Sequence, residues 1–151
     1  MIYNIVLNSA NIISGTAVNG FHSFDWSVLP ECKYKLTFSF MSGTQNLLNY
    51  PSIPSLFVDL GQNTCFTTSN NSVVAKTTHF IGVLFPNIIS GNSYLSVNRE
   101  SNTILYLLAR PNNPLFNVRI LNNLTNAPWL DINGATITNY VLNLTLETID
   151  E

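Results

Sequence analysis

The clearest structural signal in this chain is the stretch Lys33-Tyr34-Lys35-Leu36-Thr37-Phe38-Ser39-Phe40. Apolar and polar side chains alternate along it, which is the period-two pattern of a β-strand with one buried and one solvated face. The same alternation returns near the end of the chain, in Tyr140-Val141-Leu142-Asn143-Leu144-Thr145-Leu146-Glu147. We therefore predict two strands that line one hydrophobic core.

Other short apolar runs precede or separate these two strands, and turn-forming residues such as Asn19-Gly20 and Asn133-Gly134 lie between them. The runs cover residues 3–7, 21–29, 56–60, 79–85, 94–98, 104–109 and 116–121. No window has a sustained helical period, a linker or an internal repeat. The sequence predicts one all-β domain over residues 1–151, a single jelly-roll sandwich of two antiparallel sheets with about eight to ten strands.

Charged residues are unusually scarce. They make up 9% of the chain, against roughly a quarter in an ordinary soluble domain, while 46% of the residues are hydrophobic. The solvent-facing positions must then be mostly Asn, Ser and Thr, whose neutral groups lose less on desolvation than Lys, Glu or Asp. Interface cores are depleted in charged residues, so this composition indicates a surface covered by neighbouring subunits.

Composition and patterning also argue against several partners. The formal net charge is -2, and the six Lys and Arg residues are scattered singly, so no basic stripe is present for a nucleic acid. No apolar run approaches the roughly twenty residues of a transmembrane helix. The N-terminal residues lack the basic and apolar regions of a signal peptide, and we expect a cytosol-like compartment.

No cluster of residues in the sequence indicates a particular chemical reaction. His22 and His79 are the only imidazoles, and neither belongs to a recognisable catalytic motif with a nucleophile or carboxylate; for His22 the nearest carboxylate in sequence is Asp25. Cys32 and Cys65 have no metal-ligand spacing, and we interpret them as reduced, partly buried thiols, although a disulfide between them stays open. We predict a protein that is not an enzyme and has no catalytic, cofactor or metal site.

Several segments resemble small jelly-roll structural proteins of large double-stranded DNA viruses of algae and protists and of their virophage-like relatives. The similarity spans most of the chain and consists of β-strand patterning. It begins with Phe24-Asp25-Trp26-Ser27-Val28-Leu29-Pro30-Glu31 and the strand after it, and continues in Val58-Asp59-Leu60-Gly61-Gln62, Ile81-Gly82-Val83-Leu84, Asn113-Pro114-Leu115-Phe116-Asn117-Val118-Arg119-Ile120-Leu121 and the closing strand.

This resemblance implies a virion component assembled in the host cytoplasm: a minor capsid or cement protein, or a vertex (penton) subunit. Its partners would be other capsid proteins, including a major capsid protein, and further copies of itself in a pentamer or trimer. We do not expect a scaffold-threading role, because the sequence shows no long terminal arm of the kind that capsid subunits often use to reach neighbours.

Contact residues are expected in turn-rich loops and at isolated cations. The candidates are Trp129, Arg110, Arg119, Asn112, Asn113 and Tyr50. An alternative is a carbohydrate-binding or trimeric receptor-binding β-sandwich head, in which Tyr50 and Trp129 would form an exposed aromatic platform. An enzyme, the third reading, would need His22 or His79 beside a carboxylate in a cleft.

Overall fold

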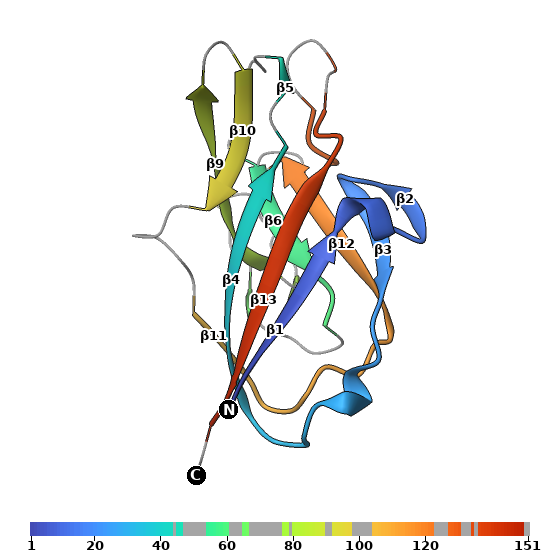
Figure 1. The fold of residues 1–151 in the computed structure, drawn as a ribbon, viewed down its shortest axis with the longest axis vertical. Coiled ribbons are helices and arrows are strands. Elements are labelled where there is room, and N and C mark those ends of the chain that lie inside the picture. Colours follow the sequence, from blue (N-terminus) through green and yellow to red (C-terminus); the bar gives the residue numbers. More distant parts are fainter. Residues whose placement is uncertain are drawn as a thin grey trace.

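The computed structural model describes residues 1–43, 45–46, 54–60, 65–66, 77–78, 80–89, 92–97, 104–122, 127–130, 134 and 136–149. The strands are β1 (Ile2–Asn8), β2 (Ser14–Thr16), β3 (Asn19–Ser23), β4 (Tyr34–Ser42), β5 (Gln45–Asn46), β6 (Pro54–Val58), β7 (Cys65–Phe66), β8 (Thr77–Thr78), β9 (Phe80–Ile89), β10 (Asn92–Val97), β11 (Leu105–Leu107), β12 (Leu115–Asn122) and β13 (Tyr140–Thr148). Among these residues, two 3-10 turns, η1 (Ser9–Asn11) and η2 (Trp26–Val28), are the helical segments (Figure 1). Each of these described turns has three residues, far fewer than a lipid bilayer requires of a spanning helix.

One curled antiparallel sheet forms most of the molecule. Its strand order is β1-β13-β4-β10-β9-β6-β12-β3-β2, with β11 paired to β4 and β5 paired to β10. A separate pair, β7 and β8, makes a second small sheet. All described pairings are antiparallel, which confirms the predicted all-β antiparallel class.

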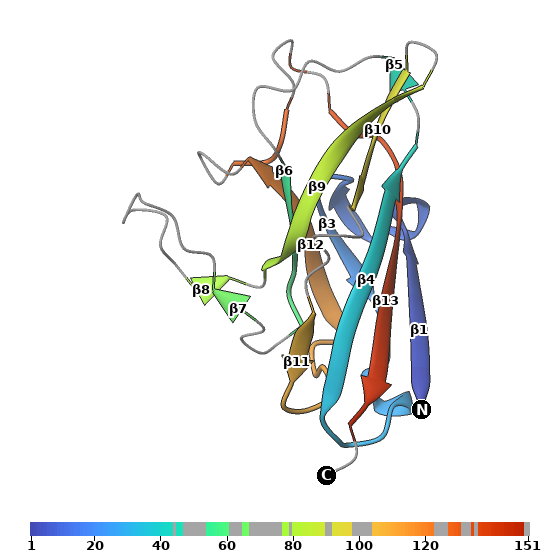
Figure 2. The same ribbon diagram turned by 90° about the vertical axis from the view of Figure 1, so that its left-hand side faces the viewer.

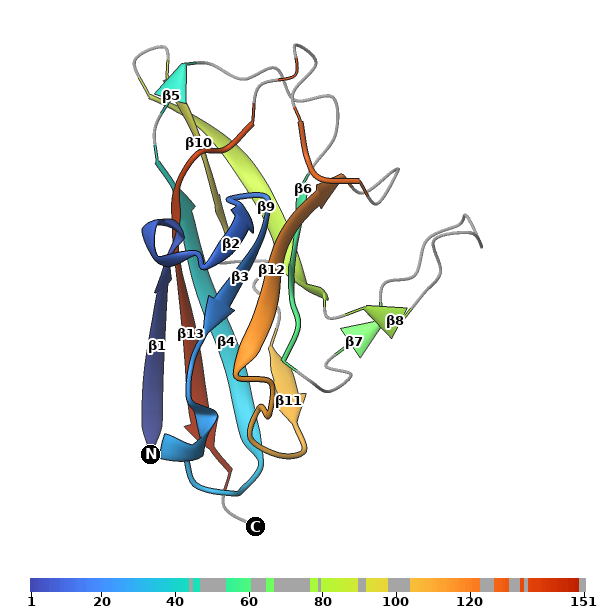
Figure 3. The same cartoon turned by 90° about the vertical axis from the view of Figure 1, so that its right-hand side faces the viewer.

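The sheet doubles back on itself through β9, so that its two halves face each other as layers (Figures 2 and 3). The first residues of β9 pair with β6, and the later ones, from Leu84 to Ile89, pair with β10. A register shift between Leu56 and Phe57 accompanies the passage, as expected where a strand bends from one layer to the other. One layer contains β1, β13, β4 and β10, and the other contains β6, β12, β3 and β2. This arrangement is consistent with a β-sandwich.

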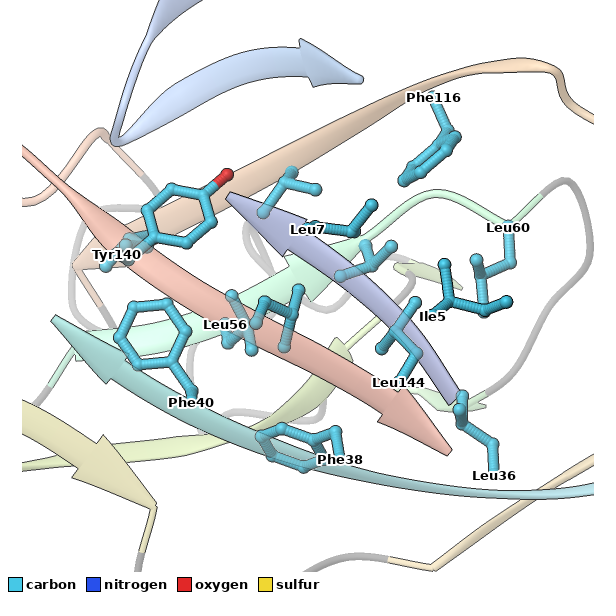
Figure 4. Packing of buried hydrophobic residues seen from close by; sticks show 14 of the residues in the cluster. Ile5, Leu7, Leu36, Phe38, Phe40, Leu56, Leu60, Phe116, Tyr140 and Leu144 are labelled. Atoms are coloured by element: carbon cyan, nitrogen blue, oxygen red, sulfur yellow. The ribbon is translucent and has the colours of Figure 1, made fainter. Parts of the chain in front are cut away.

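The core lies between the layers and follows the alternation in the sequence. Along β4 the inward side chains Tyr34, Leu36, Phe38 and Phe40 are all buried, and on β13 the same holds for Tyr140, Leu142, Leu144 and Leu146. These two strands pair in register over nine residues, from Tyr140 opposite Ser42 to Thr148 opposite Tyr34. Ile5 and Leu7 of β1 join the same cluster, which packs against Leu56 and Phe116 of the opposite layer (Figure 4).

The expected strand at residues 21–29 is wrong in its second half. Strand β3 ends at Ser23, and Asp25 caps the turn η2 by accepting hydrogen bonds from the Ser27 amide at 3.0 Å and the Ser27 hydroxyl at 2.6 Å. These bonds also lower the pKa of the Asp25 carboxyl. Trp26 is nevertheless buried, because its indole N–H donates to the Asn113 carbonyl at 2.8 Å and its ring packs on Phe24. The local hydrogen bonds of Asp25 and Ser27 outweigh the strand pattern.

Candidate interaction surface

The outward side of β1, β13 and β4 forms one continuous patch, which we call the outer face. Its members alternate with the core residues along the three strands. They are Ile2, Asn4, Val6 and Asn8 of β1, Val141, Asn143, Thr145 and Glu147 of β13, and Lys35, Thr37, Ser39 and Met41 of β4. The strand register aligns them in cross-strand rows, so the outer face is a ladder of neighbouring side chains.

Four members of the outer face are apolar and exposed: Ile2, Val6, Met41 and Val141 have exposed fractions of 58%, 63%, 57% and 45%. Val141 lies directly opposite Met41, so their side chains form an apolar pair at one end of the patch. Large side chains of this kind favour removal from water by about 25 cal/mol per Å² of apolar area. The outer face therefore offers a hydrophobic gain to any partner that covers it.

The outer face has two charged residues, and their charges are opposite in sign. Glu147 and Lys35 occupy paired positions at the other end of the patch, beside Tyr106 of β11. The remaining polar members are amides and hydroxyls, and one pair is already satisfied, since the Thr145 hydroxyl donates to Asn4 Oδ1 at 2.9 Å. Covering this patch buries few charges, and unpaired buried charges are the costliest groups to desolvate.

One amide in the middle of the outer face has an unused acceptor. Asn143 lies between Val6 of β1 and Ser39 of β4. Its Oδ1 atom is shielded from solvent and accepts no hydrogen bond from the described residues. A donor brought by a covering subunit would satisfy this oxygen.

The expectation for Trp129 is corrected by the structure. Its side chain is fully buried, with an exposed fraction of 0%, and belongs to the hydrophobic core. The backbone holds it there, because the Trp129 amide donates to the Ile120 carbonyl at 2.9 Å and the Thr136 hydroxyl donates to the Trp129 carbonyl at 2.9 Å. Trp129 thus stabilises the fold and presents no side-chain surface to a partner. No local pattern predicts this burial, because Trp129 follows a proline in a turn-rich stretch.

Arg110 links two loops through hydrogen bonds of its side chain. Its guanidinium donates to the Leu29 carbonyl at 2.8 Å and to the Glu31 carboxylate at 2.9 Å. Asn112 is exposed and lies with Arg110, Glu31 and Cys32 around an open hollow at the end of the sandwich. Arg110 therefore has a structural partner and remains partly exposed at the rim of that hollow.

The other expected contact residues lie apart from this hollow. Arg119 is half-buried on β12, with its guanidinium carbon 5.7 Å from the centre of the Phe57 ring, a cation–π distance. Asn113 is half-buried; its amide donates to the Asp59 carboxylate at 3.4 Å. Tyr50 lies outside the described residues. The candidates do not converge on one surface. Because Trp129 is buried, the aromatic platform expected of a sugar-binding head lacks this residue.

His22 is a buried link between the layers. Its Nε2 lies 2.7 Å from the Tyr140 hydroxyl, which comes from β13 on the opposite layer, and its ring stacks on Phe116. Burial lowers the pKa of His22 and raises the pKa of Tyr140, so both are neutral near pH 7. The described partner of His22 is thus a phenol and not the carboxylate that a catalytic histidine requires. His79 lies outside the described residues.

Cys32 is a free thiol beside the hollow, and the side chain of Cys65 lies outside the described part of the chain. In that described part, no three His, Cys, Asp or Glu side chains gather into a possible metal site.

No protein-family model matches the chain, and no curated protein sequence matches it either.

Proposed function

We propose that the chain is a single jelly roll and a non-enzymatic structural component of a virus particle. Support for the jelly roll comes from the pairing of eight strands of the curled sheet, which are β1, β3, β4, β6, β9, β10, β12 and β13. In chain order, the first pairs with the eighth, the second with the seventh, the third with the sixth and the fourth with the fifth. A long hairpin rolled into two sheets has this nested pairing, and jelly rolls are common in viral capsid proteins.

The observation that carries the virion role is the chemistry of the outer face. It spans three long strands, exposes four large apolar side chains and has a single opposite-charge pair. A nearly uncharged patch that combines exposed apolar side chains with neutral amides and hydroxyls suits burial against another protein. The segments that resemble viral jelly-roll proteins include β4 and β13, which contribute most of this patch.

The proposed role is that of a minor capsid or cement protein, or of a vertex (penton) subunit, in a virion assembled in the host cytoplasm. Its outer face packs against a major capsid protein, and the protein forms a pentamer or trimer. The mechanism is geometric: a tightly packed core holds three long strands in fixed register, so the patch meets its partner without rearrangement.

Co-sedimentation with the major capsid protein encoded by the same genome tests this role. Met41→Glu and Val141→Glu place a charge at the apolar end of the outer face, where burial would leave it unpaired. We expect each to weaken association by ~tenfold or more. Ser23→Glu is the matched control, because Ser23 is exposed on β3 in the opposite layer. Absence of wild-type association, or equal association of all three variants, would overturn the proposal.

A further inference from the structure

Strand β1 is an open edge of the curled sheet. The strand order begins with β1 and ends with β2, so these two have a neighbour on one side only among the described strands. Strand β2 spans three residues, whereas β1 spans seven and pairs with β13 in unbroken register. β1 is therefore the long edge at which another strand can add.

The alternation of hydrogen-bonded and non-bonded residue pairs between β1 and β13 shows which backbone groups of β1 point away from the sheet. The Thr148 amide donates to the Met1 carbonyl at 2.9 Å, which makes Met1 and Thr148 a hydrogen-bonded pair. Antiparallel pairs alternate between bonded and non-bonded types, so Tyr3, Ile5 and Leu7 direct their backbone groups to β13. The backbone N–H and C=O groups of Ile2, Asn4, Val6 and Asn8 then point away from the sheet. Among the described residues, the backbone groups of Ile2, Asn4 and Val6 have no backbone partner, whereas the Asn8 carbonyl already caps the turn η1.

Nothing in β1 protects this edge. Soluble proteins discourage edge pairing with lysines, prolines, bulges or very short strands. The sequence Ile-Tyr-Asn-Ile-Val-Leu-Asn has no charge and no proline, and its register with β13 contains no bulge. Its side chains alternate between the core and the outer face. The edge is straight, neutral and chemically ready to accept a strand.

We propose that β1 pairs antiparallel with β1 of a second copy, about a two-fold axis at Ile5. The outward-facing residues are placed symmetrically about Ile5, so Asn4 meets Val6 of the second copy and Ile2 meets its Asn8. The strand then pairs with itself through about six backbone hydrogen bonds, because the Asn8 carbonyl of each copy is engaged by η1; this number lies within the range of a typical protein interface. A head-to-tail contact would have to use the three residues of β2 and would form far fewer bonds.

Charge does not oppose this pairing. The nearest acidic member of the outer face, Glu147, lies opposite Ile2 at one end of the strand. The two-fold axis places the Glu147 side chains of the two copies at opposite ends, ~20 Å apart along the strands, beyond the screening length of about 8 Å at physiological salt. The pairing adds a two-fold contact to any cyclic assembly and does not depend on a virion role.

Amide hydrogen exchange of the full chain tests the pairing residue by residue. We expect the amides of Asn4 and Val6 to exchange slowly at high protein concentration and quickly on dilution, while those of Ile5 and Leu7 stay protected throughout. Light scattering should give twice the 16.8 kDa monomer mass, or an even multiple, at the high concentration. Concentration-independent exchange at Asn4 and Val6, or a monomer mass up to millimolar concentration, would overturn the proposal.

Asn4→Pro gives a second readout, because proline removes the outward N–H without touching the bonds to β13. The loss occurs twice in the dimer, and we expect dissociation to become ~tenfold easier or more. Thr145→Val is the matched control: it removes the hydrogen bond to Asn4 Oδ1 and leaves the edge intact. Equal dimerisation of Asn4→Pro and wild type would contradict the pairing. Met41→Glu separates this pairing from the proposed function, because Met41 lies on β4 and the variant leaves the β1 edge intact: it should dimerise like wild type whether or not it associates with the capsid protein.

Discussion

The hydrogen bond between His22 and Tyr140 links the two layers. Removal of one partner should lower the free energy of unfolding more than removal of both partners together. Tyr140→Phe leaves His22 Nε2 buried without a partner, and we expect a loss of about 1 to 3 kcal/mol in the free energy of unfolding. His22→Leu leaves the Tyr140 hydroxyl unpaired and should cost a similar amount. Both groups are almost fully buried, with exposed fractions of 2%, so water cannot replace the missing partner.

The double variant His22→Leu/Tyr140→Phe removes both polar groups at once. Replacement of both partners by apolar groups of similar shape is nearly neutral, so the double variant should avoid most of the about 2 to 6 kcal/mol that the two single losses would sum to. Urea unfolding at pH 7, with unchanged denaturant slopes, measures all four proteins. Additive losses in the double variant would refute a buried cross-layer bond.

The same pair sets an acid dependence of stability. Burial lowers the pKa of His22 in the folded protein below its value of 6.5 in the unfolded chain. Between these two values the unfolded chain binds more protons, so the stability present above pH 6.5 is lost as pH falls through the folded pKa. We expect the double variant to lose less stability than wild type between pH 7 and pH 5. Parallel losses in thermal melts of the two proteins would contradict this role of His22.

Three further substitutions test the structure at other points. Trp129→Ala should lower the free energy of unfolding by about 3 to 5 kcal/mol because it empties a fully buried site; an unchanged melting temperature would place Trp129 on the surface. Arg110→Ala should cost about 1 kcal/mol through the lost bond to the Leu29 carbonyl, while Glu31→Gln should cost less than ~0.5 kcal/mol because Glu31 is 81% exposed in this ion pair; equal losses in urea unfolding would contradict the assignment. Gly15→Ala should cost more than ~1 kcal/mol, because φ is +91° and the new Cβ would lie 2.3 Å from the Asn19 carbonyl oxygen; a melting temperature equal to that of wild type would contradict that backbone conformation.

Local patterning in the sequence was sufficient to predict the principal strands. Strands β4 and β13 follow directly from alternation, because a strand with one buried face must place apolar residues at every second position. The same holds for β1 and β12, whose bounds differ from the expected runs by one residue at each end. Burial at such positions is a local property of the chain and can be read from it.

The remaining features depend on contacts distant in the chain. The backbone of Trp129 is held by hydrogen bonds to Ile120 of β12 and to Thr136 before β13, and no local pattern predicts these bonds or the burial of its side chain. The partner of His22 is 118 residues away. The passage of β9 between layers likewise depends on pairing with both β6 and β10. The scarcity of charged residues indicated a surface that neighbouring subunits could cover. Only the strand register identifies the twelve side chains of the outer face.

A reconstruction of the virus particle at side-chain resolution tests the central claim most directly. The account predicts this protein within the particle, with Met41 and Val141 of the outer face in contact with a major capsid protein and a donor beside Asn143 Oδ1. A particle that lacks the protein, or one in which the outer face is open to solvent, would contradict it.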